Sequence, residues 1–280
     1  MSAAAAQPGI LARGSHFWAD LWISVFEFLG SLWYLAADIS MWFWRTAIRR
    51  RQPFGADALA AQMIRVGVRS IGIVVLVSAA IGMILALQTE PSLAQFGQTD
   101  KVANLVGIAV MRELGPLIAA IVLTGFAGAS IAAELGTMVV GEEIEALRTM
   151  AISPIRFLVM PRVISTAISL VVLAVIADLA AVGAGGLIGI TSLDIPYEVY
   201  RANTLAQLAP IDFLTGLLKA GAFGTLLGLI ACRNGLRVTG GAAGVGRATT
   251  DTVVQTVIVV VIADLLFTAV FYAFGWNGAN

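Results

Sequence analysis

Five long runs of apolar residues constrain this chain more than any other feature of its sequence. They cover roughly residues 66–88, 104–135, 160–190, 212–231 and 252–275. An α-helix needs about 20 apolar residues to cross the hydrocarbon core of a bilayer, and each run reaches that length. Only 12% of the 280 residues are charged, against about 25% in a typical soluble domain. The sequence therefore predicts an all-α polytopic membrane protein with five transmembrane helices.

Residues 15–49 predict a different kind of helix. Five of the six tryptophans lie here, and indole rings favour the headgroup level of a membrane. The polar residues share one side of a helical wheel; they are Asp20, Ser24, Glu27, Ser31, Asp38, Arg45 and Arg49. This pattern indicates an amphipathic helix in the membrane interface; the alternative is a true span whose acidic stripe faces protein. Residues 1–54 are therefore expected to form a tail and interfacial helix, and residues 55–280 a separate membrane domain.

The distribution of Lys and Arg predicts the orientation. With a cytoplasmic N-terminus, the inside segments hold thirteen of these residues and the outside loops only Lys101 and Arg201. Cytoplasmic loops of membrane proteins carry such an excess. The loops at 136–160 and 232–250 are therefore expected inside, and the C-terminus outside.

Three charged residues interrupt the apolar runs, namely Arg112, Glu113 and Lys219. An ionisable group in mid-membrane costs at least about 2.5 kcal/mol on insertion scales, so it usually faces protein or a water-filled cavity. One interpretation is a structural ion pair between the second and fourth spans. The other is a polar patch that lines a substrate cavity and attracts an anionic headgroup. Pro116 is expected to break the helix directly after Arg112 and Glu113 and to free backbone groups there.

Three further acids lie in or near the spans. Glu134 is expected at the cytoplasmic interface, whereas the pattern assigns no role to Asp178 or Asp264.

The segment 136–162 contains a short amphipathic helix that is acidic at its start. Ile144, Leu147 and Met150 fall on one face, and the acids and Arg148 on another. It is either a solvated connector resting on the membrane or a docking helix for a cytosolic partner.

Several classes of site are excluded by residue counts. One cysteine, Cys232, and one histidine, His16, rule out an intrachain disulfide and a Cys- or His-based metal site. The glycine-rich residues 240–247 lack the Gly-Lys-Ser/Thr ending of a phosphate-binding loop and are expected to form a flexible loop. A net charge of zero gives no argument for nucleic acid. We therefore expect no enzyme, no bound cofactor and no metal in this chain.

Three stretches resemble the MlaE/YrbE family of permeases, the membrane subunits of MCE-type lipid ABC transporters. The first is MRELGP at 111–116 with GFAG at 125–128 and AELG at 133–136. The second runs from EEIEAL at 142–147 through Ser153-Pro154 to Pro161-Arg162. The third is GVGRATT at 244–250, and the resemblance covers about residues 55–275.

The resemblance implies a dimer of permease subunits, homodimeric or with a paralogue, each with an interfacial helix and five spans. A cytosolic ABC ATPase dimer would bind ATP and Mg, and a ring of MCE-domain proteins would lie outside. A lipid cavity would lie at the dimer interface, with Arg112, Glu113 and Lys219 near it and Leu85, Leu87 and Leu114 in its wall. The coupling helix would use Glu142, Glu143, Ile144, Glu145, Leu147, Arg148 and Met150 to reach the ATPase.

The implied function is transport of phospholipid between a bacterial inner membrane and the MCE assembly. The alternatives are a YrbE-type importer of fatty acids or sterols and a non-transporting membrane scaffold. Phe126 departs from the MlaE branch, which tends to have Arg there, and Glu142-Glu143 is similar to the actinobacterial YrbE branch. We expect Lys219→Ala to alter lipid binding more than the fold.

Overall fold

The computed structural model describes residues 10–49 and 56–275, and every regular element in these ranges is helical. Within them, six helical stretches are long and apolar enough to cross a membrane. The prediction of an all-α polytopic membrane protein is confirmed. Residues 1–9, which are part of the predicted N-terminal tail, and residues 50–55 and 276–280 lie outside the described residues.

The five predicted spans correspond to five helical rods, three of them composed of several consecutive helices and two of a single helix. The first contains α2 (Ala56–Val66), η1 (Val68–Ser70) and α3 (Ile71–Ala94). The second contains η2 (Thr99–Lys101), α4 (Val102–Ala109), η3 (Val110–Leu114), α5 (Gly115–Leu123), η4 (Thr124–Gly128) and α6 (Ala129–Val140). The third contains η5 (Ile155–Val159) and α8 (Met160–Thr191), and the last two are α10 (Pro210–Leu236) and α11 (Gly241–Ala273). Two short helices, α7 (Glu143–Thr149) and α9 (Tyr197–Gln207), lie in the connections.

The helices extend beyond the apolar runs that predicted them. α3 continues past Pro91 to Ala94, and α11 begins at Gly241 rather than near residue 252. Apolar runs mark only the hydrocarbon depth, whereas the helical backbone continues because its groups bond within the helix at any depth. The expectation of a flexible loop at 240–247 was therefore wrong. Gly240 and Gly241 make the turn with φ of 84° and 67°, and the helix follows at once.

Small residues allow the central helices to approach closely. α8 packs along both α3 and α10. A Cβ on Gly82 would lie 2.0 Å from the Ala181 carbonyl oxygen, and one on Gly224 would lie 2.7 Å from the Ala167 Cα. Between lipid-embedded helices, association depends on such close packing rather than on hydrophobicity. α8 and α10 consequently form the centre around which the other spans are placed.

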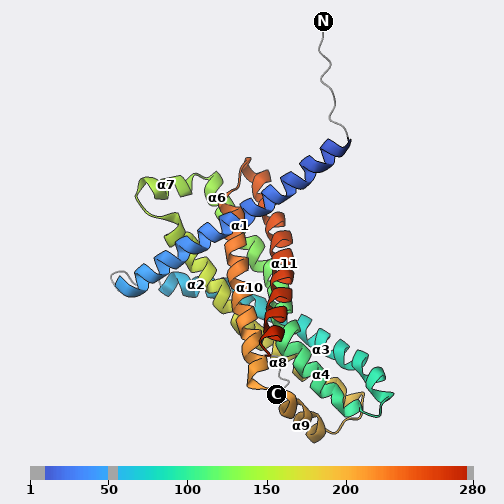
Figure 1. The fold of residues 1–280 in the computed structure, drawn as a ribbon. Coiled ribbons are helices and arrows are strands. Elements are labelled where there is room, and N and C mark those ends of the chain that lie inside the picture. The colour runs from blue at the N-terminus through green and yellow to red at the C-terminus, as the bar shows by residue number, and fades with distance from the viewer. Residues whose placement is uncertain (1–9, 50–55, 276–280) are drawn as a thin grey trace.

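The long helix α1 (Ile10–Arg49) lies obliquely across the other long helices (Figure 1). It is held by Arg233 of α10, whose Nε donates to Ser31 Oγ at 2.5 Å and whose guanidinium lies 4.7 Å from the Phe28 ring centre. Trp33 and Trp44 are 75% and 69% exposed. By length and composition the helix also qualifies as a span. Its oblique course favours the interfacial interpretation, which stays a prediction.

The connecting helices lie at opposite ends of the bundle (Figure 1). At one end lie α7 and the turn between α10 and α11, and at the other lies α9. Tyr200 of α9 packs against Gly186 and Gly189 of α8, where a Cβ would lie within 3.0 Å of its ring. Burial raises the pKa of the Tyr200 phenol above its usual value.

Candidate functional site

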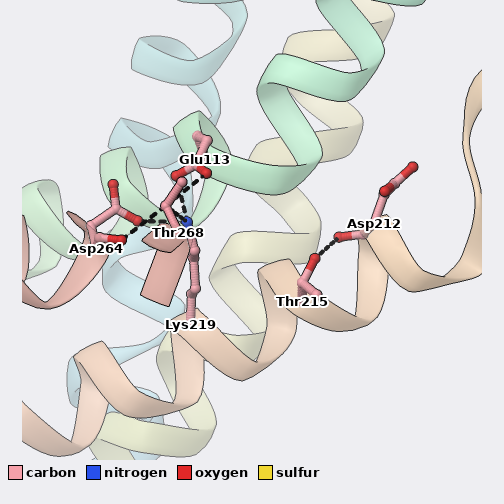
Figure 2. A network of polar contacts seen from close by, with 6 residues as sticks. All are labelled: Glu113, Asp212, Thr215, Lys219, Asp264 and Thr268. Carbon is pink, nitrogen blue, oxygen red and sulfur yellow. Dashed lines mark hydrogen bonds and ion pairs between the residues drawn. The ribbon is translucent and has the colours of Figure 1, made fainter. Parts of the chain in front are cut away.

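Lys219 is the centre of a polar network inside the bundle (Figure 2). Its side chain is 1% exposed, and its ammonium group has three partners. Nζ lies 2.5 Å from Glu113 Oε2, 2.9 Å from Asp264 Oδ1 and 2.8 Å from Thr268 Oγ1. An ammonium group has three N–H donors, so all three are used. Lys219 is thus a centre of ion pairing, with no N–H left for an anionic headgroup in this arrangement.

The network connects three spans. Glu113 comes from η3 of the second span, Lys219 from α10 and Asp264 from α11. The Thr268 hydroxyl lies 3.0 Å from Glu113 Oε1 and 2.9 Å from the Asp264 carbonyl oxygen, and it donates to one of them. The pair between the second and fourth spans is therefore joined by a third partner, Asp264, to which the sequence pattern assigned no role.

A π-helical turn positions Glu113. The Gly115 N–H bonds to the Val110 carbonyl, five residues back, and such turns often occur at functional sites. If this five-residue pattern continued, the Met111 carbonyl would accept a hydrogen bond from the backbone N–H of residue 116. Pro116 has no N–H, so that bond is not formed. The expected break at Pro116 was wrong, because this widened turn accommodates the proline inside a continuous rod.

The Met111 carbonyl lies instead against α10. A Cβ on Gly216 would be 2.2 Å from its oxygen, so a side chain there would collide with backbone. Gly216 is about one helical turn before Lys219. The missing side chain at 216 thus allows α10 to approach the π-helical turn and brings Lys219 within reach of Glu113.

Arg112 forms a second buried ion pair beside the network. Its Nη2 lies 2.5 Å and its Nε 2.7 Å from Asp212 Oδ1, and Asp212 is 1% exposed. Asp212 Oδ2 also accepts from the Ala209 N–H at 3.0 Å, which caps the start of α10. We did not single out Asp212 from the sequence. Its position in the first turn of a helix, after Pro210 and seven residues before Lys219, was the available signal.

The network reaches the surface at Glu113 and Thr268. Glu113 is 36% exposed and Thr268 is also exposed, whereas Lys219 lies behind them. The formal charges are two cations, Arg112 and Lys219, against three carboxylates, Glu113, Asp212 and Asp264. A ligand that approaches from this side therefore meets a carboxylate and a hydroxyl before it meets a cation.

The three predicted wall leucines lie in different places. Leu114 is partly buried next to Glu113 in η3. Leu85 packs against an apolar cluster that contains Ala86, Val106 and Tyr200. Leu87 is 47% exposed and faces away from Leu85, since residues two apart on a helix differ by about 200°. The structure does not bring Leu85 and Leu87 to a common face.

The predicted coupling segment forms α7 between two left-handed residues, Glu142 with φ of 58° and Ala151 with φ of 59°. Ile144 is buried and Leu147 partly buried against the main core. Glu145 and Arg148 are exposed and form a 2.8 Å ion pair. Met150, expected on the apolar face, is 60% exposed. The helix is thus anchored by two apolar residues and presents its charges outward.

Glu134 and Asp178 differ sharply in their surroundings. Glu134 is 27% exposed, pairs with Arg65 and accepts from Arg162 Nη2 at 3.2 Å. Asp178 is 3% exposed, and its Oδ1 has no hydrogen-bond partner. A Cβ on Gly115 would lie 1.8 Å from this oxygen, so Gly115 leaves room for the carboxyl. Among the described residues no group of three or more His, Cys, Asp or Glu side chains is arranged to hold a metal ion.

Comparison with known proteins identifies the family of this chain. The family model described as Permease MlaE matches residues 59–270. A probable ABC transporter permease protein of Rickettsia felis is 38% identical over 222 residues, which cover 79% of this chain and 86% of the relative. A probable ABC transporter permease protein of Synechocystis is 31% identical over 90% of this chain and 92% of the relative. The chloroplast protein trigalactosyldiacylglycerol 1 of Arabidopsis thaliana is 32% identical over 75% of this chain and 60% of the relative. This chain, with its charge network at the π-helical turn of the second span, belongs to the MlaE permease family.

Proposed function

We propose that this chain is the membrane subunit of an ATP-driven transporter that moves phospholipid between a bacterial inner membrane and an MCE protein assembly. A cytosolic ATP-binding-cassette ATPase dimer would hydrolyse ATP with Mg, and a second permease subunit would complete the membrane part. The N-terminus would be cytoplasmic and the C-terminus outside. Family membership and the permease names of the relatives support the transporter assignment, and the galactolipid in the Arabidopsis relative's name supports a lipid as the class of cargo.

The observation that carries this proposal is that the charge network reaches the surface next to an apolar helix face. Glu113 is partly exposed and Thr268 of α11 is exposed, and the outward face of α11 carries large apolar residues such as Val261, Ile262 and Leu265. A polar spot bordered by apolar side chains suits a lipid, whose headgroup and chains need both environments. It also suits a second permease subunit that would enclose the lipid against this face.

α7 is the proposed contact with the ATPase. Its outward residues Glu143, Glu145 and Arg148 are exposed, whereas Ile144 and Leu147 hold the helix to the core. A force applied to the charged side would therefore be transmitted to the spans through the two apolar anchors. This arrangement fits a coupling helix better than a connector resting freely on the membrane.

The test is native mass spectrometry of the purified chain, together with ATPase assays of the assembled complex. We expect a phospholipid bound to a permease dimer that retains a stoichiometric ATPase. The double variant Glu143→Lys with Arg148→Glu should insert normally but lose ATPase binding, because it reverses two exposed charges. Its control is Thr149→Ser, an exposed change on the same helix. A chain that carries no lipid and retains no ATPase would be a scaffold, and the proposal would be wrong.

A further inference from the structure

A second polar site lies at the α7 end of the bundle, away from the Lys219 network. Gln62, Arg65 and Arg69 line one side of a pocket of about 240 Å³, and Phe126, Ser130 and Glu134 line the other. Spacings of three and four residues put each set on one face of its helix. The pocket therefore lies between the first span and the second.

The charge around this pocket is positive. Glu134 is the one acid among the residues that line it, and it already pairs with Arg65 and Arg162. Arg69 lines the same pocket and is exposed. The two lining guanidinium groups against one carboxylate leave an excess of one positive charge, and Arg162 beside Glu134 adds a second. Such an excess attracts an anion rather than a cation.

Unused hydrogen-bond donors also line the pocket or lie beside it. The Gln62 amide nitrogen is buried and has no partner, and neither has Nε of Arg162, which contacts Glu134. In the described part of the chain Arg69 makes no hydrogen bond or ion pair. Buried polar groups are rarely left unpaired in native proteins. A ligand with several acceptor oxygens would satisfy the donors at this position.

The depth of the pocket identifies the source of such a ligand. The second span runs from Thr99 to Val140, and Glu134 lies about 14 residues beyond its midpoint, or about 21 Å along a helix. The hydrocarbon of a bilayer ends about 15 Å from its centre and the polar interface about 20–22 Å from it. Phe126, which is 45% exposed, lies on the apolar side of the pocket. The site is thus at headgroup level, and the phenyl ring of Phe126 lies at the depth where the acyl chains of a lipid would begin.

We infer that this pocket binds the phosphate of an anionic phospholipid, with Arg65 and Arg69 as the phosphate ligands and Gln62 as an additional donor. Planar guanidinium groups bind phosphate through paired hydrogen bonds. At about 240 Å³ the pocket is smaller than those that enclose a drug-sized ligand, about 300–1,000 Å³. It therefore holds a headgroup while the acyl chains stay outside. This site is distinct from the proposed transport cavity and does not require transport.

The experiment measures phosphatidylglycerol binding to the delipidated full chain, without ATP or partner subunits. Arg69→Gln should weaken binding about tenfold, or about 1.4 kcal/mol, and Ser130→Phe should do the same by filling the pocket. Arg148→Gln removes another exposed arginine at the same end of the bundle but outside the pocket, and should leave binding unchanged. Diacylglycerol, which has no phosphate, should not bind there.

Two results would overturn the inference. If Arg69→Gln and Ser130→Phe both bind phosphatidylglycerol as the wild type does, the pocket is not a headgroup site. If inorganic phosphate binds with the same dependence on Arg69 while phosphatidylglycerol binding is unaffected, the site serves soluble phosphate and the lipid source is wrong. Because binding is measured without transport, either result leaves the proposed transport function to its own test.

Discussion

The Lys219 network and the α7 helix both contain ion pairs, but the two regions use charge in opposite ways. Lys219 is 1% exposed and pairs with residues from two other spans. Arg148 and Glu145 of α7 are 62% and 66% exposed and pair only with each other. Removing one partner of a buried pair leaves an uncompensated charge, whereas an exposed pair is hydrated with or without its partner. Buried charge here fixes how the spans are arranged, and exposed charge is available to a partner protein.

Lys219→Ala tests the contrast between buried and exposed charge with the largest expected effect on stability. It would leave Glu113 and Asp264 without their cation, and breaking a buried pair typically costs about 3–5 kcal/mol. We expect a large loss of folded protein and a lower Tm in detergent. This reverses the expectation from sequence alone, in which the same substitution affected lipid binding more than the fold.

The control for Lys219→Ala removes all three charges together. Lys219→Met with Glu113→Gln and Asp264→Asn leaves no unpaired ion, and replacement of a complete buried network is often nearly neutral. Most of the lost stability should return in this triple variant. An equally low Tm for the triple variant and Lys219→Ala would mean that packing, not charge, dominates at this position.

Gly216→Ala tests the close approach that creates the network. The added methyl group would lie 2.2 Å from the Met111 carbonyl oxygen, and overpacking typically costs about 1–3 kcal/mol. We expect a lower Tm from thermal unfolding in detergent. Gly221→Ala on the same helix is the matched control, because its methyl group would meet only Val171 Cγ2 at 3.6 Å. Equal effects at both positions would argue against a special role for the Met111 contact.

Thr268→Val tests the exposed edge of the network. The change keeps the shape but removes an acceptor for Lys219 and a donor near Glu113. A typical hydrogen bond contributes about 0.5–1.5 kcal/mol, so the unfolding midpoint should shift modestly. Thr268→Ser, which keeps the hydroxyl, should retain most of the stability. If Ser is as destabilising as Val, the methyl group contributes as much as the hydroxyl, and the hydrogen bonds of Thr268 do not dominate at this position.

Arg148→Ala should have the smallest effect on the permease itself. Exposed ion pairs contribute about 0.2–1 kcal/mol, and the pair with Glu145 spans a single helical turn. The Tm of the isolated chain should therefore barely change, while affinity for the ATPase should fall if α7 is the contact. A clear loss of stability in the isolated chain would contradict the contrast between the two regions.

Much of the fold could be predicted from the sequence because the solvent imposes it. In lipid every backbone group must be bonded within its own segment, so long apolar runs become helices with little choice. The same runs did not predict the helical ends. Gly241–Ala273 starts about ten residues before its apolar part, since residues at the interface remain helical without being apolar.

The candidate site could be predicted only in part. The sequence singled out Arg112, Glu113 and Lys219 because charges inside apolar runs are costly. It did not reveal that Asp212 and Asp264 are their partners, because those residues are 100 and 45 positions distant from Arg112 and Lys219. Such pairing depends on which helix faces lie together, and local sequence does not encode that.

By itself the sequence determined that this is a helical membrane protein, where its charges break the spans, and which family it resembles. Only the tertiary structure decided that Pro116 is accommodated by a π-helical turn, that Gly216 admits the Met111 carbonyl, and that Lys219 has all three donors filled. The physical reason is one of range. Transfer to lipid acts on each segment separately, whereas ion pairing and close packing require atoms from distant segments to meet within a few ångströms.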